Sequence, residues 1–171
     1  MGVTVLEPAV LMVFPAAVAF AGAIDFFTMT IPNRVSLALV AGFAVVGPLA
    51  GLGVGDLLSH LAAGLIVLAV GILLFIPGWI GGGDAKLAAA VALWLGFGHL
   101  VDYLACVALL GGAMTLGFMT LRTYPLPPAL CCQTWAVRLH DPRAGIPYGV
   151  ALAAGALLIY PHSQWFARII G

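Results

Sequence analysis

Charged residues are scarce in this sequence. Only 7% of its 171 residues are Asp, Glu, Lys or Arg, whereas 64% are hydrophobic. A soluble domain usually carries about 25% charged residues, so lipid must be the solvent for most of this chain's surface. The six acidic and six basic residues give a formal net charge of zero, which offers no basic patch to a nucleic acid partner.

Paired cysteines and an early basic region are also missing. The three cysteines, Cys106, Cys131 and Cys132, form no CxxC pair, so the sequence predicts neither a zinc site nor a disulfide framework. We therefore expect no metal and no cofactor.

No Lys or Arg precedes Arg34. A secretory signal peptide needs a basic leading region, so we expect the first apolar segment to be retained.

Long apolar runs fill most of the chain. A membrane-spanning helix needs roughly 20 mainly apolar residues, and these runs do not alternate with the period of two that a strand requires. The sequence predicts an all-α fold, a polytopic transmembrane helix bundle that forms one domain over residues 1–171. The expected six spans cover approximately residues 9–24, 35–52, 57–76, 85–97, 100–121 and 148–161.

The few basic residues predict the orientation of these spans. Positive charges favour the cytoplasmic side, and five of the six basic residues lie in or beside the first, third and fifth loops. These five are Arg34, Lys86, Arg122, Arg138 and Arg143. We therefore expect both termini outside the cytoplasm. The tryptophans, among them Trp94 and Trp165, are expected at the membrane interfaces.

Two aspartates should lie at the same membrane face. Asp25 ends the first apolar run and Asp84 opens the fourth, so both are at the side predicted to be cytoplasmic. Acids at membrane spans are costly and usually functional. Paired carboxyl groups can share a proton, one activating water while the other protonates a carbonyl oxygen or leaving amine. The alternative is that each acid caps a helix or pairs with Arg34 or Lys86.

Glycines surround Asp84. It follows Gly81, Gly82 and Gly83, which allow positive φ angles and close approach of another chain. Asp is also a favoured residue at a helix N-cap, so this motif alone is compatible with simple capping. Lys86 could pair with Asp84 or with a lipid phosphate.

A second motif follows Asp25. In the sequence Ile31-Pro32-Asn33, Pro32 interrupts the backbone where the second helix should begin. Asn33 could cap that helix.

These motifs, in this order, resemble those of the small type IV prepilin peptidases, especially the form that serves tight-adherence (Flp-type) pili. The likeness includes the GxGD element at Gly81, Gly83 and Asp84, and Pro147-Tyr148-Gly149 at the start of the last span. It implies that Asp25 and Asp84 are the catalytic pair. The reaction it implies is removal of the basic leader from prepilins, next to a glycine, at the cytoplasmic face of a bacterial inner membrane.

The sequence departs from this family in two places. Larger members carry an insert with paired CxxC motifs, which is absent here, and Val150 stands where a second proline is expected. A small proton- or ion-coupled transporter and a non-catalytic pilus assembly subunit remain the alternative functions. A transporter should have acids near mid-membrane and repeated halves. The expected partners are a prepilin substrate and membrane lipid, and the sequence predicts no oligomeric state.

Overall fold

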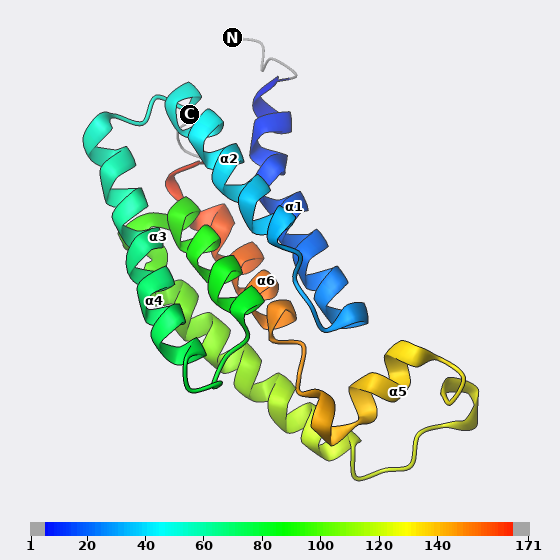
Figure 1. The fold of residues 1–171 in the computed structure, drawn as a ribbon. Coiled ribbons are helices and arrows are strands. Elements are labelled where there is room, and N and C mark those ends of the chain that lie inside the picture. Colours follow the sequence, from blue (N-terminus) through cyan, green and yellow to red (C-terminus); the bar gives the residue numbers. More distant parts are fainter. Residues whose placement is uncertain (1–5, 166–171) are drawn as a thin grey trace.

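The computed structural model describes residues 6–165, and within that range the chain is helical without any strand (Figure 1). The α-helices are α1 (Leu6–Thr28), α2 (Asn33–Leu49), α3 (Val54–Phe75), α4 (Gly82–Leu121), α5 (Thr134–His140) and α6 (Tyr148–Ile159). Short 3-10 turns occupy Pro128–Leu130, Pro142–Ala144 and Tyr160–His162. The predicted all-α fold is confirmed.

The helices form a polytopic bundle. Helices α1, α3 and α4 are long and apolar enough to cross a membrane, and α2 and α6 are shorter apolar helices. Figure 1 shows α1, α2 and α3 running in alternating directions and α4 folding back on itself before α6 returns. The six apolar segments predicted from the sequence are therefore all present as helical segments.

The fourth and fifth predicted spans are joined without a loop. They lie within the single element α4, which is interrupted only at Gly96, where φ is 64° and ψ is −177°. The two predicted spans are thus present as separate helical segments, and the turn between them lies at Gly96 rather than after Phe97. A Cβ on Gly96 would lie 2.8 Å from the ring of His60, so this reversal depends on glycine.

The core lies around two tryptophans. Trp94 and Trp165 are fully buried, and the Trp94 indole N–H donates to the Leu39 carbonyl over 2.8 Å. The Trp165 indole N–H donates to the Trp94 carbonyl over 2.7 Å. The expectation that these two side chains anchor the chain at the membrane interfaces is wrong, because both are enclosed by protein and buried backbone carbonyls accept their indole N–H groups. Trp79, in contrast, is 76% exposed.

The outer surface is apolar. Leu73, Leu109 and Leu116 are between 66% and 75% exposed, and many other large apolar side chains point outward in the same way. A water-soluble monomer rarely exposes such contiguous apolar surface, so this surface agrees with a lipid environment.

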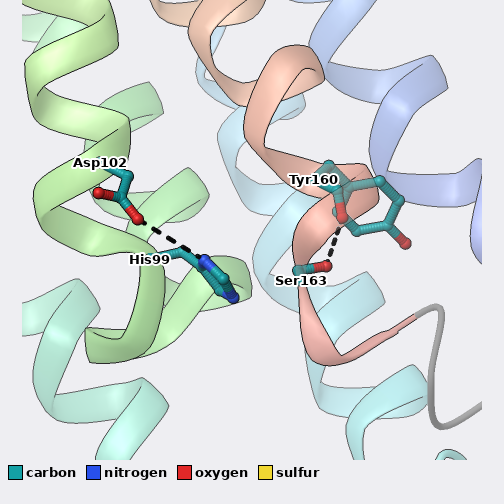
Figure 2. Close-up of polar contacts among 4 residues, drawn as sticks. All are labelled: His99, Asp102, Tyr160 and Ser163. Carbon is teal, nitrogen blue, oxygen red and sulfur yellow. Dashed lines mark hydrogen bonds and ion pairs between the residues drawn. The ribbon is translucent and has the colours of Figure 1, made fainter.

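The two ends of the bundle differ in their polar contacts. One end carries the connections at residues 29–32, 76–81 and 122–147, where Figure 1 shows α5 projecting away from the bundle. At the opposite end His99 lies 4.0 Å from Asp102, and the Ser163 hydroxyl donates to the Tyr160 carbonyl (Figure 2). The Asp102 side chain is 67% exposed, so this acid lies on the surface.

Candidate active site

Asp25 lies in the last turn of α1 and points into the bundle. Its residue is only 4% exposed, and the backbone N–H of Gly149 donates to its Oδ2 over 2.8 Å. Gly149 belongs to the first turn of α6, where backbone N–H groups have no partner within their own helix. The α6 N-terminus therefore binds the Asp25 carboxyl group through both a hydrogen bond and the helix dipole.

Gly149 is required at this contact for steric reasons. A Cβ there would lie 2.7 Å from Oδ2 and 2.9 Å from Cγ of Asp25, and 2.7 Å from the Ile31 side chain. Any other residue would have to displace the carboxyl group or Ile31. Pro147 occupies the N-cap position of α6, where the missing proline N–H removes no helical hydrogen bond.

Asp84 occupies the first turn of α4, and Gly81 is the N-cap residue. The Gly81 backbone N–H hydrogen-bonds to the Asp84 carboxyl group, in the manner of an N3 acid that reaches back to the N-cap. A Cβ on Gly81 would lie 2.7 Å from Asp84 Oδ2, so glycine permits this contact. Asp84 thus contributes to capping, and this role is compatible with a catalytic one.

The start of α4 packs against the connection between α1 and α2. A Cβ on Gly83 would lie 3.2 Å from the Ile31 Cβ and 3.4 Å from the Ile31 carbonyl oxygen. Ile31 therefore contacts both Gly83 and Gly149, one at each acid. This packing brings Asp25 and Asp84 close enough to interact electrostatically.

The connection to α2 is held by Lys86 and Asn33. The Lys86 ammonium group donates to the Asn33 Oδ1 over 2.9 Å, so its partner within the described residues is Asn33 rather than Asp84. Pro32 is the N-cap residue of α2, without a side-chain cap. The expectation that Asn33 caps α2 is therefore wrong, since its amide oxygen accepts from Lys86 across the gap between two helices.

The sequence interpretation missed two arginines near the site. Arg138 of α5 donates to the Thr28 carbonyl over 3.0 Å, which satisfies a free carbonyl at the end of α1. Arg122 donates through Nε to the Leu139 carbonyl over 2.9 Å, and through its terminal nitrogen to Gly145. Both arginines were recognised only as orientation signals, because the sequence does not show which carbonyls they meet.

Asp102 and Asp141 do not join the site. Asp141 accepts from the backbone N–H of Arg143 over 2.9 Å, and Asp102 lies at the opposite end with His99. Cys131 and Cys132 are exposed and Cys106 is half-buried. Among residues 6–165, no group of three or more His, Cys, Asp or Glu side chains could hold a metal ion.

Fold and site together define a class of protein, a membrane helix bundle with two carboxyl groups at one end that are close enough to interact electrostatically. The sequence model of the type IV leader peptidase family matches residues 12–116, more than half of the 171 residues. The chain belongs to the type IV leader peptidase family and is a peptidase by that membership. Asp25 and Asp84 lie inside the matched range and Gly149 outside it. No curated protein and no solved structure matches the chain.

Proposed function

We propose that this membrane peptidase is an aspartic endopeptidase of the GxGD type that removes leader peptides from type IV (Flp-type) prepilins. Asp25 and Asp84 are its catalytic pair. The observation that supports this most strongly is the electrostatic proximity of two carboxyl groups from helices distant in sequence, each with its own backbone N–H donor. Two neighbouring carboxyl groups that share one proton can supply the base and the acid for peptide hydrolysis.

In this mechanism, one carboxylate removes a proton from water while the resulting hydroxyl attacks the scissile carbonyl carbon. The other carboxyl group gives its proton to the carbonyl oxygen, forming a tetrahedral gem-diol. As the C–N bond breaks, the leaving nitrogen takes a proton from the protonated carboxyl group, and one diol hydroxyl gives its proton to the other carboxylate as the carbonyl re-forms, so that the pair again holds one proton. In this proposal Asp25 exchanges its proton through Oδ1, while its Oδ2 accepts from Gly149.

The proposed location is the inner membrane of a bacterium, with the carboxyl pair toward the cytoplasm. The proposal rests on the basic residues of the connecting loops, since Arg122, Arg138 and Arg143 all lie in the 122–147 connection at the carboxyl-bearing end. Positive residues favour the cytoplasmic side of a membrane protein. A prepilin substrate, with a basic leader and an apolar helix, would then approach from the cytoplasm and the lipid.

The test compares Asp25→Asn, Asp84→Asn and the control Asp141→Asn for cleavage of a purified Flp-type prepilin by the full-length protein in lipid vesicles. Asn keeps an oxygen that can accept from Gly149 or Gly81, so the fold should persist. Each of the first two changes should reduce the rate about 100- to 10,000-fold, because the pair acts as a unit. Asp141→Asn should cleave like the wild type, and a chelator should change nothing.

The remaining alternatives give different results in this assay. A non-catalytic assembly subunit would show no cleavage in the wild type. A metal-dependent peptidase would lose activity with the chelator and regain it with zinc. Near-normal cleavage by Asp25→Asn or Asp84→Asn would disprove the assignment of the pair. An ion-coupled transporter is disfavoured because both acids lie in the terminal turns of their helices, whereas a transporter should carry its acids near mid-membrane.

A further inference from the structure

A second site lies beside the carboxyl pair but does not open onto it. A groove of about 440 Å³ runs between α2, α3 and the first part of α4. Asn33 and Lys86 lie at one end of it, and apolar or small side chains line the rest. Those lining residues are Ser36, Leu37, Val40, Leu61, Gly64, Leu65, Leu68, Ala89, Ala90 and Leu93.

The groove and Asp84 are on opposite sides of α4. At about 100° per residue, which follows from 3.6 residues per turn, Lys86 and Leu93 lie roughly 200° and 180° around the helix from Asp84. Both residues line the groove. The groove is therefore separated from the carboxyl pair by the helix itself, and a molecule bound in it would not contact Asp84.

The dimensions of the groove suit an extended chain. From Asn33 to Val40 the α2 axis advances by about 10 Å at 1.5 Å per residue, and both residues line the groove. The groove therefore follows α2 for about two helical turns, a length that part of an acyl chain can fill.

The polar end of the groove is positively charged. One N–H of the exposed Lys86 ammonium group donates to Asn33 Oδ1 over 2.9 Å. An ammonium group has three donors, so two more can reach a bound phosphate. Because Lys86 lies in the first turn of α4, at the helix end that carries Asp84, its charge is near a membrane surface. A positive end joined to an apolar channel matches an amphiphile with an anionic head.

We propose that this groove binds one anionic phospholipid, with an acyl chain between α2 and α3 and the headgroup phosphate on Lys86. The bound lipid fills the space between two helices that both pack on α4, and it holds the Lys86–Asn33 contact at the edge of the active site. This proposal is independent of the proposed peptidase mechanism, because every measurement below detects lipid rather than cleavage.

The acyl-chain part of the proposal is tested with two valines of α2. Val40 lines the groove and is 45% exposed, whereas Val45 is 60% exposed and does not line it. The full-length protein, its Val40→Trp variant and the control Val45→Trp are purified in mild detergent, mixed with phosphatidylglycerol and examined by native mass spectrometry. Wild type and Val45→Trp should retain one phosphatidylglycerol molecule, and Val40→Trp should lose it. Equal retention by all three would overturn the proposal.

The headgroup part is tested with Lys86→Gln and with phosphatidylcholine of the same acyl chains. The wild type should bind phosphatidylglycerol more tightly than phosphatidylcholine. In Lys86→Gln the ratio of the two affinities should be about fivefold smaller, which corresponds to about 1 kcal/mol. Inorganic phosphate alone should not compete, since the acyl chain supplies the rest of the binding. An unchanged preference in Lys86→Gln, or displacement of the lipid by the apolar segment of a prepilin, would overturn the proposal.

Discussion

At the scale of single residues, glycines determine where the two carboxyl groups lie, because they allow close contacts with the backbone. Gly149 lets the start of α6 reach Asp25, and Gly81 lets its own backbone N–H reach Asp84. Ile31 packs against Gly83, which precedes Asp84, and against Gly149, which donates to Asp25. A methyl group on Gly149 or Gly81 would displace the neighbouring carboxyl group without removing it.

Gly149→Ala tests whether the rate of cleavage depends on the position of the Asp25 carboxyl group. The alanine Cβ would lie 2.7 Å from Asp25 Oδ2, so the carboxyl group must shift. Displacement of a reacting group by about 1 Å can reduce a rate about 100-fold, and we expect a loss of that size in prepilin cleavage. The control is Gly112→Ala, where no atom lies within 4 Å of the new Cβ. Wild-type cleavage by Gly149→Ala would contradict the proposed geometry.

Single-residue roles could be predicted from the sequence only in part. The resemblance singled out Asp25, Asp84 and Gly149, and the structure brings these three together. The partner of Lys86 could not be predicted, because it depends on the distance between the starts of α2 and α4. The same holds for Arg138, whose carbonyl partner lies 110 positions away in the sequence.

At the scale of helices, α4 is unusual because it reverses direction at a single residue. Gly96 adopts φ 64° and ψ −177°, a region of backbone space that is essentially restricted to glycine. The ring of His60 packs against it, and the His60 Nδ1 lies 2.8 Å from the Leu93 carbonyl. The reversal is thus fixed by backbone conformation and by packing from α3.

Gly96→Ala should therefore destabilise the protein. A non-glycine residue in this conformation costs about 1–3 kcal/mol, and the new Cβ would also meet the His60 ring. The matched control is Gly98→Ala, two residues away, where nothing lies within 4 Å of the new Cβ. There alanine should be neutral or stabilising by up to about 1 kcal/mol. Denaturant unfolding in detergent measures both, and equal stabilities would contradict the role of Gly96.

The helices themselves were largely predictable. Long apolar runs located every major helix, because a spanning helix must bury an apolar sequence of a minimum length. Their ends were less predictable: α1 continues to Thr28, past the expected end near residue 24. Helix α5 was not predicted at all, since its seven residues, Thr134–His140, are too few to give a clear periodic pattern.

At the scale of the whole molecule, the longest connection lies at the same end as the carboxyl pair (Figure 1). It contains Cys131 and Cys132, both exposed. These cysteines report which side of the membrane the active site faces.

Labelling with a membrane-impermeant maleimide tests the proposed orientation. In a Cys106→Ala background, Cys131 and Cys132 should react in inverted membrane vesicles and remain unmodified in intact spheroplasts. The control adds Gly53→Cys to a chain without the native cysteines; Gly53 is exposed in the connection at the opposite end, with space for a side chain. That residue should react only in spheroplasts. The reverse pattern would place the carboxyl pair outside the cytoplasm.

The contact between Asp25 and Gly149 joins residues 124 positions apart, which has a consequence for biosynthesis. The ribosome makes α1 first and α6 last, so the first aspartate enters the bilayer long before its hydrogen-bond donor exists. During translation the partly inserted chain holds both acids but not the helix that orients one of them. Under the proposed mechanism, competence to cut peptides therefore arises only after α6 has been inserted, and a nascent chain that stalls before α6 carries no assembled protease.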